Sequence, residues 1–415
     1  MSASDRRFPI YDAWMMAASS HATSHDTPTR FSYTPSTSVE GRQKLAMSLV
    51  HFVGSDVPPP PEYRRTMPGL WIVPSLGTAI AVVFNLPNYT GIDLKIPRAA
   101  LADIFIGRIR KWSELAEWNE RLTGVRENIS LVVQADGAES YWLTSALSSF
   151  STEWRGKVGI SSKPAWPTFT VCIQDNIGML IATQTTPYSL GYMSLLASKQ
   201  FGAPTALIQN FQGAWVAPTT RGVAAALDMF AYETAEIGEA IESARDFSLS
   251  IVDPQRNVSY TQSSAADVYP ISVLTYIMFD DTASVASEVF ERIIYLLYWI
   301  WTAPEAAKEA EAHGFSPIAP NLIAPIVSQL RQASSRIADS TAFGSNPYKG
   351  IVDRVLYRFN PCVNGAGAAE PYAPKLVARP ALRLFFVCCI SHRCVATGGV
   401  PCTSGGWRVH PPTQR

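Results

Sequence analysis

Short strand-like runs alternate with helix-like runs over residues 8–335, and this alternation constrains the fold more than any other feature of the sequence. Apolar, often β-branched runs predict strands near residues 51–54, 70–73, 78–85, 129–133 and 268–278. Runs with apolar residues on one face predict helices at 40–50, 98–105, 112–122, 140–150, 223–244, 283–303 and 304–313. Such alternation is typical of an α/β architecture.

The charge balance and the hydrophobic runs exclude several classes of protein. Lys and Arg number 34, as do Asp and Glu, so no net field would steer the chain to nucleic acid, and no nucleic-acid partner is expected. The most apolar run, Ile293–Trp301, is about half the length of roughly 20 residues that a membrane-spanning helix needs. The polar first residues show no secretory signal, which predicts a soluble chain.

The segment 336–415 differs from the rest of the chain. It is basic, rich in Pro and Gly, and without clear periodicity, so we expect a poorly structured, disordered tail. The residues Cys388, Cys389, His392 and Cys394 are of types that suit zinc, but their spacing does not match the usual zinc sites. We therefore expect no metal and no cofactor.

The predicted helix N-termini are the features of the sequence that are best suited to bind a ligand. The chain has no P-loop, no GxSxG elbow and no histidine in a nucleophile-like context, so a non-enzymatic protein is expected. Ser38 precedes one predicted helix and residues 136–140 open another, and free N–H groups at such ends attract oxyanions. Asp136 and Glu139 also have capping-box spacing, and spacing alone favours the cap.

Residues 101–112, LADIFIGRIRKW, resemble the signature of the periplasmic phosphate-binding proteins of bacterial phosphate transporters, the PstS-like family. Further matches follow in the same order and extend over about residues 7–330: Phe8-Pro-x-Tyr-x-x-Trp14, Val53-Gly-Ser-Asp56, Asn85-Leu-Pro87, Val133-x-x-Asp-Gly137, Thr186-Pro-x-Ser-x-Gly-Tyr192 and Tyr269-Pro-Ile271.

The resemblance implies a two-lobed type II periplasmic-binding-protein fold, in which a two-strand hinge joins two α/β lobes. Lobe 1 would comprise residues 1–83 and 269–335, and lobe 2 residues 84–268. The family binds inorganic phosphate or a similar oxyanion, is exported to the periplasm or the cell exterior, and delivers its solute to a membrane transporter or receptor. A monomer is expected.

The resemblance also implies a set of ligand-binding residues. Phe8 would offer its backbone N–H, Ser38 its hydroxyl, and Asp56 a carboxylate that senses the phosphate proton. The binding loop would contribute Asp136 (which orients an arginine in the family), Gly137 and Ser140.

The binding loop departs from the family pattern at three positions. Gln134 stands where the family has arginine, Ala138 where it has serine, and Glu139 where it has glycine. Loss of the charged partner could cost about 1.5–3 kcal/mol. Arg7 stands where the family has a threonine ligand. It either restores the missing positive charge or is an exposed charge near the N-terminus.

Three functions follow from these patterns. The first is a solute-binding protein that closes on a small oxyanion, inorganic phosphate in the first place, for uptake or sensing. The second is a divergent binding-fold domain that has lost phosphate affinity and serves as a receptor-like or protein-interaction module. An enzyme with Asp56 and Asp136 as acid and base has little support, because the family uses such acids as ligand acceptors.

Overall fold

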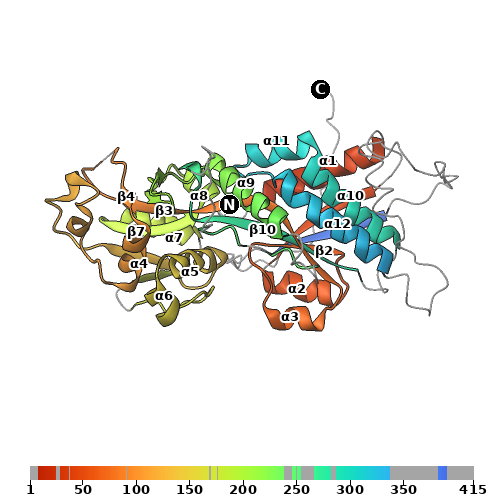
Figure 1. Ribbon diagram of the computed structural model, residues 1–415, viewed down its shortest axis with the longest axis horizontal. Helices are drawn as coiled ribbons and strands as arrows, with labels where there is room; N and C mark the ends of the chain where they lie inside the picture. Colours follow the sequence, from red (N-terminus) through yellow and green to blue (C-terminus); the bar gives the residue numbers. More distant parts are fainter. Residues whose placement is uncertain are drawn as a thin grey trace, which may run out of the picture.

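The computed structural model describes residues 8–24, 29–36, 38–89, 91–167, 170–174, 176–237, 245–248, 250–253, 266–281, 287–336 and 382–389. Within them the chain forms two α/β lobes, as the resemblance implies, and one long strand joins them (Figure 1). Arg7 lies outside the described residues.

The main sheet runs through both lobes. Its strands have the order β1-β11-β2-β10-β3-β7-β5-β6. Their bounds are β1 Thr29–Ser36, β2 Phe52–Ser55, β3 Leu70–Asn85, β5 Ser130–Gln134, β6 Val171–Ile173, β7 Ser189–Ser194, β10 Ser272–Asp280 and β11 Leu382–Cys389. A smaller sheet contains β4 (Lys95–Ile96), β8 (Leu207–Gln209) and β9 (Trp215–Val216).

Strand β3 joins the two lobes. Leu70–Ala79 pairs antiparallel with β10, and Ile80–Asn85 pairs antiparallel with β7. The sequence predicts two strands here because Pro74 and Gly77 interrupt the apolar run, but the structure forms one strand of 16 residues. Proline is tolerated because the register of the β3–β10 pair shifts beside it, and this bulge interrupts the hydrogen-bond ladder.

Helix α9 (Thr220–Ile237) packs directly on β3. A Cβ atom at Gly77 would lie 2.7 Å from Leu227 Cδ1 and 2.9 Å from Val223 Cγ1, so only a residue without a side chain allows this approach. Helix α9 also contacts β10 and α12 (Pro320–Arg336). The lobe boundaries implied by the resemblance remain a prediction, and these contacts favour placing α9 with lobe 1.

The other helices cover the two lobes (Figure 1). Lobe 1 has α1 (Phe8–Ser24), α10 (Ser287–Thr302), α11 (Pro304–Ala312) and α12 on one side of the sheet, and α2 (Ser38–Ala46) and α3 (Pro61–Thr66) on the other. Lobe 2 has α4 (Arg98–Ile106), α5 (Ala138–Phe150), α6 (Thr152–Lys157), α7 (Asn176–Thr185) and α8 (Leu195–Gln200). The helix predicted at 112–122 is instead two 3₁₀ turns, Trp112–Leu115 and Glu120–Leu122.

The most apolar run of the sequence belongs to the core of lobe 1. Ile293–Trp301 lies within α10, and all but one of these side chains are buried. Helix α10 contacts α1, α11 and β3, so its apolar side chains pack against protein. Among the described residues, no helix combines the length and apolarity that crossing a bilayer requires.

Strand β11 corrects the prediction for part of the tail. The sequence predicts no ordered element after residue 336, yet Leu382–Cys389 forms a strand parallel to both β1 and β2 and lies between them. A short apolar run is a weak strand signal by itself, because its partners are fixed only by tertiary contacts. Residues 337–381 and 390–415 lie outside the described residues.

Candidate functional site

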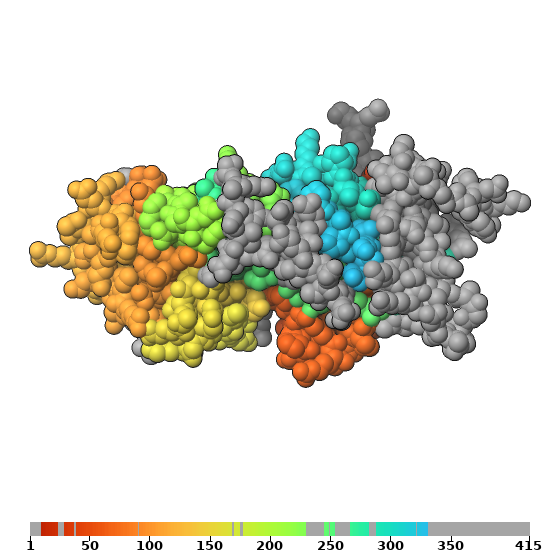
Figure 2. All heavy atoms as spheres, viewed as in Figure 1, coloured from red at the N-terminus to blue at the C-terminus, as the bar shows by residue number. Residues whose placement is uncertain are grey.

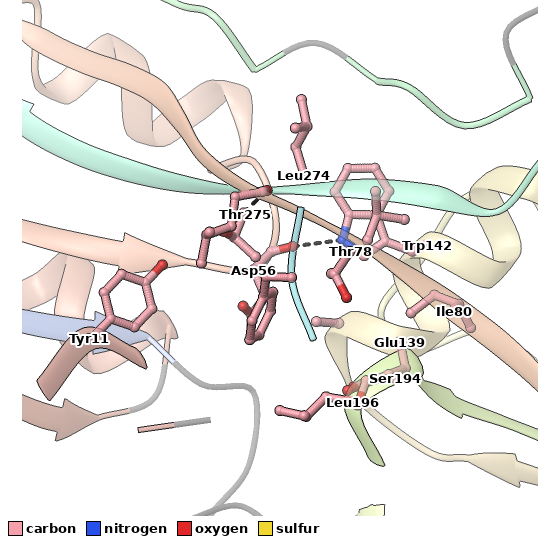
Figure 3. A pocket seen from close by; sticks show the side chains of 14 residues that line it. Tyr11, Asp56, Thr78, Ile80, Glu139, Trp142, Ser194, Leu196, Leu274 and Thr275 are labelled. Carbon is pink, nitrogen blue, oxygen red and sulfur yellow. Dashed lines mark hydrogen bonds between the residues drawn. The ribbon is translucent and has the colours of Figure 1, made fainter. Parts of the chain in front are cut away.

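A cavity of about 30 Å³ lies where the two lobes meet (Figure 3). Such a volume suits a few water molecules or one small solute, at about 10–15 Å³ per water. Lobe 1 contributes the first turn of α1, the residue after β2, and facing parts of β3 and β10. Lobe 2 contributes the start of α5 and the β7–α8 junction. The polar side chains that line it are Tyr11, Asp56, Thr78, Glu139, Trp142, Ser194 and Thr275.

The molecular surface is indented close to this junction. Figure 2 shows a notch between the yellow surface of α5 and α6 and the orange-red surface of α2 and α3. The notch separates α2 and α3, which flank β2 and Asp56 in the sequence, from α5, the helix that contains Glu139. The cavity is therefore placed where opening of the lobes would expose it to solvent.

Asp56 lines the cavity, as the resemblance implies. It follows the last residue of β2, whose backbone is paired on both edges. Its backbone carbonyl accepts a hydrogen bond of 2.6 Å from Nε1 of Trp142 on α5. Trp142 is buried, and the ring of Tyr141 packs edge-on against it at 5.1 Å. This hydrogen bond joins lobe 1 to lobe 2 directly beside the cavity.

Glu139 also lines the cavity, and its side chain is 1% exposed. Helix α5 begins at Ala138 with Gly137 as its N-cap and has no side-chain cap hydrogen bond. The capping box expected from the spacing of Asp136 and Glu139 is therefore absent from this helix start. Asp136 is half-exposed, pairs with Lys163 at 3.1 Å and does not line this cavity, and its ligand role remains a prediction.

The hydroxyl of Ser140 points into the interior of lobe 2. It donates to the backbone carbonyl of Gln134 at 3.0 Å and lies 2.6 Å from the hydroxyl of Tyr192. Tyr192 accepts the N–H of Gln134 at 2.9 Å, and burial raises the pKa of this phenol, which keeps it a neutral donor. The Ser140 hydroxyl thus has hydrogen-bond partners inside the lobe, and its ligand role remains a prediction.

Gly137 has a packing role. Its N–H donates to the carbonyl of Ser162 at 2.9 Å, and its predicted ligand role remains a prediction. A Cβ atom here would lie 2.2 Å from Oε1 of Gln134, so a larger residue at 137 would displace the side-chain amide of Gln134. Gln134, which replaces the family's arginine, is fully buried in lobe 2.

Two further predicted residues stand at helix starts. Phe8 is the first residue of α1 and Ser38 the first residue of α2. Helix α1 places Tyr11 in the cavity wall one turn after Phe8. The side chains of Phe8 and Ser38 lie outside the described residues, so their ligand roles remain predictions.

Sequence reasoning missed the hydroxyl groups of the cavity wall. The hydroxyl of Tyr11 lies 3.3 Å from Ser75 Oγ, which lies 2.9 Å from Thr275 Oγ1. Ser194 caps α8 by accepting the N–H of Ala197 at 3.3 Å. Tyr11 falls within a matched motif, but spacing does not indicate that α1 and β10 place the side chains of Tyr11 and Thr275 in the cavity wall.

One half-buried cation lies near the site. Arg64 on α3 interacts electrostatically with Tyr141, the neighbour of Trp142, and burial lowers the pKa of its guanidinium. It forms an ion pair with Asp246 and donates to Ser248 Oγ at 2.9 Å. Among the described residues, no lysine or arginine lines the cavity itself, and no cluster of His, Cys, Asp and Glu is arranged to hold a metal.

Comparison with known proteins identifies the family. The family model for the PBP superfamily domain matches residues 1–291. The chain belongs to the PBP superfamily. This finding confirms the family predicted from the sequence motifs, and the two-lobed α/β structure agrees with it.

The relatives within the PBP superfamily include phosphate-binding proteins. The chain is 27% identical to the phosphate-binding protein PstS of Xylella fastidiosa over 322 residues, which are 77% of this chain and 81% of the relative. It is 31% identical to PstS of Pasteurella multocida over 231 residues, 55% of this chain and 65% of the relative. A crystal structure of a DING protein matches with a TM-score of 0.54 at 20% identity, over 76% of this chain and 90% of that one, which shows the shared fold.

Proposed function

We propose that this chain is a solute-binding protein that closes its two lobes over a small oxyanion, inorganic phosphate in the first place, for uptake or sensing. The observation that carries the proposal is the cavity at the lobe junction, where Asp56 of lobe 1 and the start of α5 in lobe 2 share one wall. The PstS relatives are phosphate-binding proteins, which supports this class of ligand.

Asp56 gives the site its expected selectivity. A carboxylate accepts hydrogen bonds, so Asp56 can bind a protonated oxygen of hydrogen phosphate. Sulfate carries no proton at neutral pH, so the same carboxylate would repel it. The partial positive charge at the N-terminus of α5 favours the anion, and the hydroxyls of the cavity wall can donate to its unprotonated oxygens.

The affinity is expected to be moderate. Asp56 and Glu139 bring two carboxylates to the cavity, and Gln134 supplies no positive charge from its buried position. The loss of a charged donor costs about 1.5–3 kcal/mol, or about one to two decades of affinity. The phosphate affinity should therefore lie below that of a site with an arginine at residue 134.

The family also suggests the setting in which the protein acts. We propose a monomer in the periplasm or outside the cell, which delivers its solute to a membrane transporter or receptor. We propose no catalytic step, since the acids of the cavity have the role of ligand acceptors in this proposal. The PstS names of the relatives support binding rather than catalysis.

A calorimetric titration of the full chain with phosphate and then sulfate at neutral pH tests the proposal. The expected result is heat with phosphate and none with sulfate. D56N should weaken phosphate binding and reduce the discrimination against sulfate. D103N, which removes a carboxylate on α4 that pairs with Arg108, should leave both unchanged.

Two outcomes would contradict this account. Unchanged binding of both anions by D56N would show that the site is assigned wrongly. No heat with either anion, from a protein that unfolds cooperatively, would favour the second candidate, a receptor-like or protein-interaction domain that has lost phosphate affinity.

A further inference from the structure

Thr78 lies on β3 beside the point where this strand passes from one lobe to the other. It pairs with Val273 on β10, and the pairing with β7 begins two residues later at Ile80. Its side chain lines the cavity together with Asp56 and Glu139 (Figure 3). A group on the connecting strand moves little during lobe closure, so Thr78 keeps its place in the cavity wall.

The hydroxyl of Thr78 is buried without a hydrogen-bond partner among the described residues. The residue is 9% exposed, and Oγ1 makes no hydrogen bond within the described part of the chain. By contrast, Thr275 Oγ1 lies 2.9 Å from Ser75 Oγ, and Ser194 Oγ accepts a backbone N–H. Buried polar groups almost always have a partner, because an unpaired one destabilises the fold.

We infer that Thr78 is a ligand-binding residue whose hydroxyl hydrogen-bonds the oxyanion in the cavity, an inference that rests on the proposed function. The sequence motifs give Thr78 no role, and the structure alone places it in the cavity wall. A hydroxyl can donate to an unprotonated oxygen of hydrogen phosphate while Asp56 accepts the proton from another. Thr78 thereby supplies a neutral donor in a binding site where Gln134 and Ala138 replace the family's arginine and serine.

Substitution of Thr78 by a residue of the same shape tests the inference. T78V replaces the hydroxyl by a methyl group, and T78S keeps the hydroxyl. Titration of the full chain with inorganic phosphate should show about three- to tenfold weaker binding by T78V, the range for one lost hydrogen bond, and near wild-type binding by T78S. The thermal midpoint of ligand-free T78V should not fall, since the hydroxyl has no protein partner to lose.

Thr183 offers a matched control. It lies on α7, is 2% exposed, and its Oγ1 also has no hydrogen-bond partner among the described residues. It does not line the cavity between the lobes. T183V therefore makes the same chemical change at an equally buried position, and its phosphate affinity should equal that of the wild type.

The outcomes separate this inference from the proposed function. Equal phosphate affinity of T78V and wild type would overturn the role of Thr78 alone. A lower thermal midpoint of ligand-free T78V with unchanged affinity would also overturn it, because the hydroxyl would then have a structural role. If T78V does not fold, the comparison of T78S with T78A decides in the same way. A folded wild type without any heat of phosphate binding would overturn both proposals together.

Discussion

The hydrogen bond from Trp142 to Asp56 makes a specific prediction about lobe closure. The indole N–H lies in α5 of lobe 2 and its acceptor follows β2 of lobe 1, so the bond exists only while the lobes are closed. W142F removes this N–H and keeps an aromatic ring at the position. The change therefore acts mainly on the closed arrangement of the lobes.

The magnitude follows from the geometry of the bond. It is 2.6 Å long and Trp142 is 3% exposed, so its loss leaves the Asp56 carbonyl without this donor at a partly buried position. Such a loss costs about 1–2 kcal/mol. Because the cost falls on the closed state, which the ligand selects, the phosphate affinity should fall about five- to thirtyfold.

A calorimetric titration of W142F with phosphate measures this effect, and W154F is the matched control. Trp154 is fully buried, and its Nε1 donates to the carbonyl of Gly159 at 3.2 Å, with both residues in lobe 2. W154F should lower the thermal midpoint and leave phosphate affinity nearly unchanged. If W142F weakens binding no more than W154F, the bond does not contribute to closure.

Two further predictions concern buried carboxylates. E139Q should bind phosphate about five- to tenfold more tightly, because a negative charge beside the anion is removed, and an unchanged or weaker affinity by titration would contradict this. For Asp281, burial raises the pKa of its carboxyl above 3.8. The hydrogen bond from Trp71 and the charge of Arg245 lower this pKa, but burial has the larger effect. The folded state then binds this proton more tightly than the unfolded state. The protonated carboxyl therefore contributes to the free energy of unfolding at low pH, and this contribution is lost as the pH rises through the folded pKa. The stability of wild type relative to D281N in urea should therefore fall as the pH rises above the ordinary pKa of about 3.8, and a rise would refute the sign.

The sequence predicts the fold well where local pattern decides it. The run at 98–105 becomes α4, and the run at 140–150 becomes most of α5, because their apolar residues share one buried face. The ordered motifs identify the PBP superfamily, because they include residues in loops as well as in helices and strands. Strand β3 is longer than predicted because a bulge in its pairing with β10 tolerates Pro74, and no local pattern shows a bulge.

The site is less predictable, because it depends on where side chains point. Asp56 lines the cavity as expected, but Ser140 turns to Tyr192 and Asp136 turns to Lys163. Ser140 forms its hydrogen bonds and Asp136 its ion pair with residues of their own lobe. Thr78 has no motif at all, and only the crossing of β3 between lobes brings its hydroxyl to the cavity.

The position of Asp56 depends on segments that are far apart in the chain. It follows β2, a strand of four residues that pairs with β10 on one edge and with β11 on the other. The pairing with β11 extends to Ser55, which is opposite Cys389 and directly precedes Asp56. A strand this short is positioned mainly by its two neighbours, so the tail strand helps to fix the direction in which Asp56 leaves the sheet. The segment 382–389 thus supports the site without lining it, and the full chain is the unit whose anion binding should be measured.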